Sequence, residues 1–269
     1  MKSLNGAELA SYIKARQARQ VRALRQAHGV FPHLAIIQTT DDPVINTYVR
    51  LKKIYGEEIL IDVVSYRLTE DEALVKIREL NDDNSVHGII VQLPLHDTSR
   101  TDELVDAVLP EKDVDALGQQ AILDPATPMA INWLLAGYNV DLKAKKIVIV
   151  GNGRLVGAPL ARMWRNSGYD VTVLDKNSPN IEEKVYQSDV VVTAAGQPNL
   201  ITSDMLKQKA VVVDAATASE NGEIVGDVAT DVRERDDIAI TPVKGGVGPL
   251  TVTALFDNVI RSSAASKQD

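Results

Sequence analysis

The sequence has no cysteine, few aromatic residues and no long apolar run. Without thiols the protein cannot form disulfides, thiolate metal sites, iron–sulfur clusters or a cysteine nucleophile. Because Phe, Trp and Tyr make up only 4% of the 269 residues, aliphatic side chains must fill the core. No segment approaches the roughly 18 consecutive apolar residues of a membrane span, and the N-terminus lacks the apolar core of a signal peptide. We therefore expect a soluble, cytoplasmic protein with no membrane partner.

An excess of positive charge and clusters of metal-ligand residues are also missing. The formal net charge is −8, which argues against a nucleic-acid partner. The four histidines show no spacing typical of metal ligands: His28, His33, His87 and His96. We expect no bound metal.

What the sequence does contain is two series of short apolar strands that alternate with helical segments. The first series comprises 34–37, 59–64 and 88–91, and the second comprises 146–150, 171–174, 190–193 and 211–213. Such alternation is typical of parallel sheets covered by helices on both faces. The pattern pauses between Leu109 and Pro128, and a Gly- and Pro-rich stretch from Thr241 to Gly248 is a candidate hinge. We predict an α/β protein of two domains.

The strand at 146–150 runs into the pattern G-x-G-x-x-x-G and then into a helix at 158–166. Glycines at this point let the backbone approach a pyrophosphate, whose charge is met by amides at the helix N-terminus. Tight strand–helix turns also use glycines for shape alone, so that alternative stays open. The predicted dinucleotide loop consists of Gly151, Asn152, Gly153, Arg154, Leu155, Val156 and Gly157.

An acidic residue, Asp175, ends the next strand, 22 residues after Gly153. A carboxylate about 20 residues past the glycines typically bonds the adenosine ribose and repels a 2′-phosphate, which favours NAD over NADP. The alternatives are a solvated strand end or a helix cap, with Lys176 beside it softening the repulsion.

Two further loops follow strand ends, at 194–198 and 214–217. Ligands of open parallel sheets lie outside the carboxyl ends of the strands, so small residues there suit the nicotinamide half of a cofactor. We assign Ala195, Gly196 and Thr217 to cofactor binding, although ordinary loop chemistry explains each loop taken alone.

Four polar residues are candidates for catalysis. Tyr48 and Lys52 stand four apart on a predicted helix and so share one face. Burial of such a lysine lowers its pKa and suits it to proton transfer. Gln92 directly follows the third strand, and Asp115 ends the acidic turn at 110–115. The alternatives are a solvated helix pair, a loop hydrogen bond and a solvated turn.

Taken in order, these segments resemble the bifunctional methylenetetrahydrofolate dehydrogenase/methenyltetrahydrofolate cyclohydrolase family almost end to end. The most specific segment is I-T-P-V-K-G-G-V-G-P-L-T at 240–251. The others are D-D-P at 41–43, Y-V-R-L-K at 48–52, V-Q-L-P-L at 91–95, P-E-K-D-V-D at 110–115, P-A-T-P at 125–128 and the glycine loop at 151–157.

The resemblance implies oxidation of 5,10-methylenetetrahydrofolate with NAD or NADP, followed by hydrolysis to 10-formyltetrahydrofolate. It implies that Lys52 serves the hydrolysis and influences hydride transfer, and that Gln92 tunes Lys52. Tyr48 would stack near the folate ring system, and Asp115 would hold the amino-nitrogen edge of the pterin. A substrate-binding loop would line the cleft between the domains: Gly245, Gly246, Val247, Gly248 and Pro249.

The resemblance also implies the domain organisation. An N-terminal α/β catalytic domain, residues 1–124, is completed by residues 250–269, and a Rossmann-type, doubly wound parallel-sheet domain is inserted at 125–249. The partner is a small folate substrate, and a homodimer is expected.

Several positions depart from the family pattern. Asn152 replaces a small or basic residue and Gly153 a serine, while Ala116 stands where glycine is usual in a segment that is shortened before Pro125. Lys244 replaces a proline, and Ile45 a small polar residue. Two alternatives therefore stay open: a monofunctional NAD-dependent methylenetetrahydrofolate dehydrogenase, and a non-catalytic nucleotide-binding module on the same scaffold.

Overall fold

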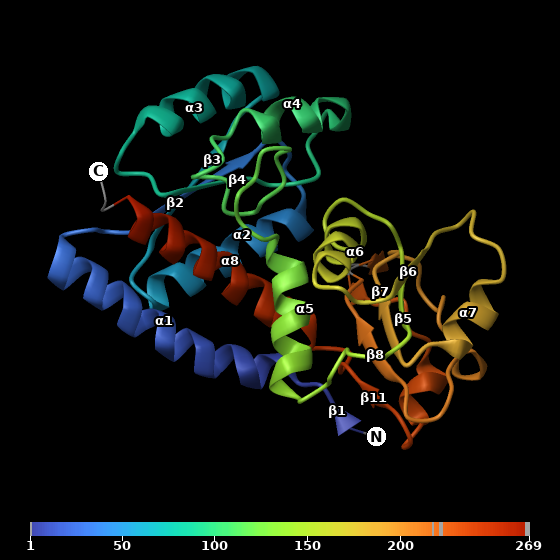
Figure 1. Ribbon diagram of the computed structural model, residues 1–269. Helices are drawn as coiled ribbons and strands as arrows, with labels where there is room; N and C mark the ends of the chain where they lie inside the picture. The colour runs from blue at the N-terminus through green and yellow to red at the C-terminus, as the bar shows by residue number, and fades with distance from the viewer. Residues whose placement is uncertain (1, 217, 221–222, 267–269) are drawn as a thin grey trace. The chain divides into compact units, whose positions relative to one another are not determined.

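The computed structural model describes residues 2–216, 218–220 and 223–266 (Figure 1). The chain forms two compact units. The first unit comprises Ser11–Ala126 and Val252–Asp269, and the second comprises Met1–Ala10 and Thr127–Thr251. Each unit is built on a parallel sheet, so the predicted α/β class is confirmed. Residues 2–10, which the sequence analysis grouped with the catalytic domain at 1–124, pack in the second unit.

A three-stranded parallel sheet in the order β3–β2–β4 forms the centre of the first unit. In Figure 1, α3 and α4 lie on one face of this sheet, while α2 and α8 lie on the other. The strands are β2 (His33–Gln38), β3 (Asp62–Arg67) and β4 (Gly88–Val91). The helices are α1 (Gly6–His28), α2 (Pro43–Glu58), α3 (Glu70–Asp82), η1 (Thr98–Arg100), α4 (Thr101–Asp106) and α8 (Val247–Ala265).

The apolar runs that form β2 and β4 are buried on both faces, whereas β3 at the edge of the sheet is only partly buried. All four residues of β4 are buried. One face packs on Ala73 and Ile77 of α3 and on Leu104 of α4. On α8, Phe256 stacks on Tyr55 of α2 with ring centroids 4.9 Å apart. Burial on two faces explains why these strands are uniformly apolar rather than alternating.

The second unit contains a six-stranded parallel sheet in the order β1–β11–β8–β7–β5–β6. Its strands are β1 (Lys2–Ser3), β5 (Ile147–Val150), β6 (Val171–Leu174), β7 (Val190–Thr193), β8 (Val211–Asp214) and β11 (Ala239–Ile240). A separate hairpin pairs β9 (Ala218–Glu220) with β10 (Glu223–Val225). The helices are α5 (Ala126–Gly137), α6 (Gly157–Asn166), α7 (Ile181–Gln187), η2 (Ser203–Met205) and η3 (Thr230–Glu234).

The strand order of the second unit reverses at β5. From β5 the chain goes to β6 on one side and then to β7 on the other. At such a switch point the loops after two neighbouring strands diverge and leave room for a ligand at their carboxyl ends. The predicted glycine loop follows β5, so the fold puts it at this point.

Among the described residues, no helix combines the length and the hydropathy needed to cross a bilayer.

Candidate active site

Lys52 and Gln92 meet in the first unit, although 40 residues separate them in the sequence. Lys52 lies on α2, whose first turn is fixed because the Asp42 carboxylate accepts hydrogen bonds from the amides of Val44 and Ile45. Gln92 directly follows β4, and its backbone amide donates to the Ile37 carbonyl of β2 at 2.8 Å. The Lys52 Nζ donates to the Gln92 Oε1 at 2.6 Å. Sheet pairing and helix capping therefore position both partners.

Asp115 acts electrostatically on the same lysine. Burial lowers the pKa of Lys52 below its ordinary value, and the negative charge of Asp115 partly opposes that shift. Burial raises the pKa of Asp115, and the positive charge of Lys52 opposes that shift. A lysine held this way loses its proton more readily than a solvated one, which suits it to proton transfer.

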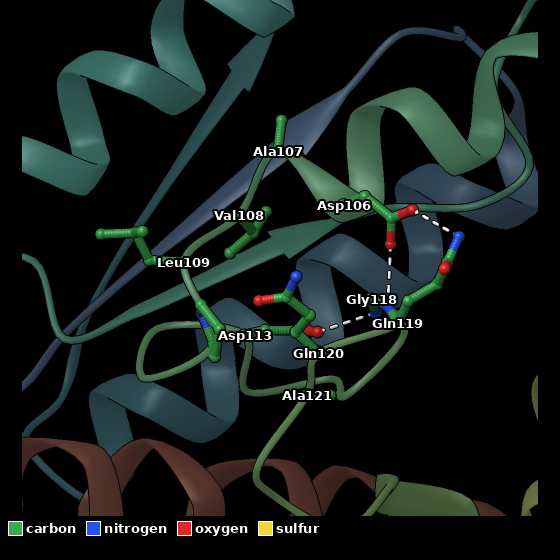
Figure 2. A pocket seen from close by; sticks show the side chains of 10 residues that line it. Asp106, Ala107, Val108, Leu109, Asp113, Gly118, Gln119, Gln120 and Ala121 are labelled. Carbon is green, nitrogen blue, oxygen red and sulfur yellow. Dashed lines mark hydrogen bonds between the residues drawn. The ribbon is translucent and has the colours of Figure 1, made fainter.

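Hydrogen bonds, most of them partly buried, hold the turn that carries Asp115. The Asp113 carboxylate accepts from the amide of Gly118 at 2.9 Å, and the Lys112 Nζ donates to three carbonyls at the end of α3. A pocket of about 230 Å³ lies beside this turn (Figure 2). Asp106, which lines the pocket, accepts from both the amide and the Nε2 of Gln119. Residues of the loop thus satisfy the carboxylates of Asp106 and Asp113 in the pocket wall.

Tyr48 lies one helical turn before Lys52 on α2, and both side chains are half-buried. Residues four apart on a helix share one face, so the phenol ring and the amine are neighbours. The first unit therefore brings together Tyr48, Lys52, Gln92 and Asp115, the four residues that the sequence analysis singled out for catalysis.

In the second unit, the glycine loop at 151–157 shows which glycines the turn requires. Gly151 has φ of +108°, and a Cβ there would lie 2.4 Å from the Ala194 carbonyl oxygen. A Cβ on Gly157 would lie 1.9 Å from the Gly151 carbonyl oxygen. Gly153, by contrast, has no atom within 4 Å of such a Cβ. Gly151 and Gly157 are thus needed for shape, whereas Gly153 leaves open space beside the loop.

The start of α6 fits an anionic group. Its first turn contains no acidic residue, and no described side chain caps its N-terminus. The positive end of the helix dipole therefore faces the glycine loop and favours a pyrophosphate there. The structure therefore fits the predicted dinucleotide loop, with Asn152, Arg154, Leu155 and Val156 between the two shape-determining glycines.

Asp175 directly follows β6 and is exposed. Its Oδ1 accepts from the amide of Asn177 at 2.9 Å and from the Ser178 hydroxyl at 3.1 Å. Asp175 is therefore a solvated strand end, one of the two alternatives, and it also closes a turn; the N-cap of the following helix is Asn180.

The loop after β7 packs against the glycine loop. Ala194 donates its backbone amide to the Val150 carbonyl at 2.8 Å. The backbone of Ala194 and Ala195 lies so close to Gly151 that a Cβ there would clash with both residues. Gly196 has φ of +68°, a conformation that favours glycine. Thr217 lies outside the described residues. Sequence reasoning missed Asp227, whose buried carboxylate accepts from the amides of Ala195 and Gln197, because no local motif links it to that loop.

The segment Gly245–Pro249 packs on the start of α1 within the second unit. Ala7 donates its amide to the Gly245 carbonyl at 2.9 Å. A Cβ on Gly6 would lie 1.9 Å from the Gly246 carbonyl oxygen, while Gly248 has open space around it. Val247, Gly248 and Pro249 form the first turn of α8.

The comparisons with known proteins agree with this architecture. Residues 4–115 match the model for the tetrahydrofolate dehydrogenase/cyclohydrolase catalytic domain, and residues 125–267 match the model for the NAD(P)-binding domain of the same family. The chain belongs to the tetrahydrofolate dehydrogenase/cyclohydrolase family. The resemblance stated from the sequence motifs is thereby confirmed.

Relatives in this family match over nearly their whole length. The bifunctional protein FolD of Bacillus subtilis is 37% identical over 97% of this chain and 96% of its own. The crystal structure of the bifunctional dehydrogenase/cyclohydrolase FolD from Campylobacter jejuni is 36% identical, with a TM-score of 0.92 over 98% of this chain and 99% of that one. A Trypanosoma brucei FolD structure, described as complexed with NADP and an inhibitor, is 30% identical with a TM-score of 0.93, over 99% of this chain and 98% of that one.

The two family models leave residues 116–124 between them unmatched. This segment contains the departures at Ala116 and before Pro125. Ala116 adopts φ of +55°, a left-handed conformation that disfavours alanine and favours the glycine usual in the family. Of the other departures in this family member, Ile45 is buried in the core and Lys244 is exposed.

Proposed function

We propose that this protein oxidises 5,10-methylenetetrahydrofolate with a nicotinamide cofactor and hydrolyses the resulting 5,10-methenyltetrahydrofolate to 10-formyltetrahydrofolate. The single observation that carries the proposal is the arrangement of Lys52, Gln92 and Asp115. It supplies a lysine of lowered pKa on the family scaffold, which both steps can use. The full-length similarity to bifunctional relatives supports the pairing of the two activities.

Lys52 assists the hydrolysis. Water attacks the carbon between N5 and N10 of the methenyl cation, and the neutral Lys52 amine accepts the proton that the water releases. The bond from this carbon to N5 then breaks as the hydroxyl proton leaves and the formyl C=O forms, and N5 takes up a proton, so that the overall step releases one proton. Gln92 orients the amine because its Oε1 accepts from Nζ.

Asp115 and Tyr48 bind the folate. A carboxylate offers two acceptor oxygens to the amino-nitrogen edge of a pterin, and that bidentate geometry suits Asp115. Tyr48, one turn from Lys52, offers an aromatic face for stacking against the folate ring system. The segment Gly245, Gly246, Val247, Gly248 and Pro249 contributes further contacts to the folate.

Gly151 to Gly157 hold the cofactor pyrophosphate, with Ala195, Gly196 and Thr217 toward the nicotinamide half. The nicotinamide, when bound, supplies the hydride acceptor for the oxidation. The protein contributes binding and alignment of the two reactants. Asp175 favours NAD because its charge repels a 2′-phosphate. If NADP is preferred instead, Arg154 and Lys176 are the candidate phosphate partners.

We keep the functional domains that the sequence predicts, residues 1–124 with 250–269 for catalysis and residues 125–249 for dinucleotide binding, although the first residues of the chain pack in the second unit. We include in the proposal a homodimer in the cytoplasm, since the acidic, cysteine-free composition suits a reducing compartment and exposed sheet edges commonly pair.

The test is formation of reduced cofactor from 5,10-methylenetetrahydrofolate, run in parallel with NAD and NADP, together with direct hydrolysis of 5,10-methenyltetrahydrofolate. Both activities are expected, with NAD effective at lower concentration than NADP. Oxidation without hydrolysis would replace the proposal by the monofunctional dehydrogenase. Cofactor binding without turnover would leave a nucleotide-binding module.

A further inference from the structure

Asp227 is a fully buried carboxylate that none of the proposed chemical steps uses. It follows the β9–β10 hairpin and reaches the loop after β7. Its Oδ2 accepts from the Thr193 hydroxyl and, at 2.7 Å, from the amide of Ala195. Its Oδ1 accepts from the amide of Gln197, also at 2.7 Å. One carboxylate thus binds three donors, from the last residue of β7 and from two residues of the loop that follows it.

The loop that Asp227 holds is in direct contact with the glycine loop. A Cβ on Gly151 would lie 2.4 Å from the Ala194 carbonyl oxygen and 2.8 Å from the Ala195 amide nitrogen. Ala194 also donates its backbone amide to the Val150 carbonyl at 2.8 Å, so the loop after β7 is hydrogen-bonded to the residue directly before Gly151. The position of these residues therefore sets the shape of the sheet edge at the switch point between β5 and β7.

Asp227 is in turn held by a second buried acid. The Asp214 carboxylate, at the end of β8, accepts from the amide of Asp227 at 3.1 Å. Arg233 pairs with Asp214 at 3.2 Å and donates to the Thr241 carbonyl at 2.9 Å. Burial raises the pKa of Asp214, and the hydrogen bonds that its carboxylate accepts from the backbone amides of Asp227 and Val228 oppose that shift. These contacts connect the β7 loop with Thr241, which precedes the Gly245–Pro249 segment.

We propose that Asp227 is a positioning residue for cofactor binding: its buried carboxylate holds residues 194–197 in the shape that receives the nicotinamide half, and Asp214 and Arg233 hold Asp227. A dinucleotide lies across the carboxyl ends of the strands, with the adenosine on the β6 side and the nicotinamide on the β7 side. Asp227 acts on the β7 side alone. The inference rests on the proposed function, since it assumes that a dinucleotide binds this edge.

The change Asp227→Asn tests the inference with little change in size. An amide side chain has one acceptor oxygen, so its NH₂ group faces the amide of Ala195 or Gln197, and one of these donors loses its partner. The matched control is Asp189→Asn. Asp189 precedes β7 at the opposite end of the strand, where it accepts from the Lys146 amide at 2.8 Å and pairs with Lys207. Both variants are made in the full chain.

Three quantities are measured for each variant: the Kd of the preferred dinucleotide, the Kd of the matching ADP-ribose fragment, which lacks the nicotinamide ring, and the rate of methenyltetrahydrofolate hydrolysis without cofactor. For Asp227→Asn we expect the dinucleotide Kd to rise about tenfold or more, as for loss of a charge-assisted hydrogen bond. The fragment Kd should rise less than about threefold, and hydrolysis should stay within about twofold. For Asp189→Asn we expect all three to stay within about twofold.

A general loss of structure would weaken dinucleotide and fragment equally, and that result would overturn the inference. If Asp227→Asn fails to fold, Thr193→Val removes one donor to the same carboxylate and should shift the same ratio of Kd values in the same direction. A wild-type protein that binds no dinucleotide would overturn both the proposed function and the inference. Normal binding by wild type and by Asp227→Asn would overturn the inference alone.

Discussion

The Nζ of Lys52 donates a hydrogen bond of 2.6 Å to the Oε1 of Gln92. This contact joins the helix α2 to the end of the strand β4. Because the amide oxygen can only accept, the contact orients the amine of Lys52, a group whose pKa is lowered by burial.

Replacing Lys52 by alanine should abolish the hydrolysis of methenyltetrahydrofolate. General acid–base catalysis contributes about 10²- to 10⁴-fold, so we expect a fall in kcat of that size. The control is Lys53→Ala, since Lys53 is the exposed neighbour on the same helix. Equal activity of the two variants would refute the role of Lys52.

The pH profile of the hydrolysis should respond to Asp115. Neutral Lys52 is the active form, so the rate rises with pH through the lowered pKa of this lysine. The negative charge of Asp115 raises that pKa, and Asp115→Asn should therefore move the rising limb to lower pH while weakening folate binding. The measurement is kcat against pH, with Glu111→Gln, on the exposed side of the same turn, as control. A shift to higher pH would contradict the proposed electrostatics.

Two glycines of the dinucleotide loop should behave differently. A Cβ on Gly157 would lie 1.9 Å from the Gly151 carbonyl oxygen, so Gly157→Ala should destabilise the fold by about 1–3 kcal/mol or more. A Cβ on Gly153 meets no atom within 4 Å, so Gly153→Ala should keep the unfolding temperature. It should weaken cofactor binding, because the added carbon enters the open space where the pyrophosphate is proposed to approach the loop. Thermal unfolding and a cofactor titration of both variants check this pair of outcomes. Equal unfolding temperatures would show that the loop adapts to the added carbon.

Cofactor choice should depend on the charge of Asp175. Asp175→Asn keeps the Oδ1 that accepts from the Asn177 amide, so the turn survives while the charge is lost. We expect the ratio of kcat/KM for NADP to that for NAD to rise about tenfold, as for removal of one repulsive contact. Asp170→Asn, at the other end of β6, serves as control. An unchanged ratio would direct attention to Arg154 and Lys176.

Much of the fold follows from local patterns. The uniformly apolar strands at 88–91 and 147–150 indicate parallel sheets, because a strand buried on both faces has no polar side. The family motifs extend that prediction to the whole chain. The N-terminal residues Lys2 and Ser3, however, pair with β11, 237 residues away in register, and no local pattern predicts such a partner.

By itself the sequence determined the α/β class, the family and the residue types of the site, because these depend on spacings within short segments. Only the tertiary structure decided which of them act together. Lys52 and Gln92 meet because α2 packs on a sheet that ends at Val91. The proposed role of Asp227 follows only from its hydrogen-bond partners Ala195 and Gln197, which lie about 30 residues away in the chain. A buried carboxylate is defined by the donors around it, and chain folding alone brings those donors together.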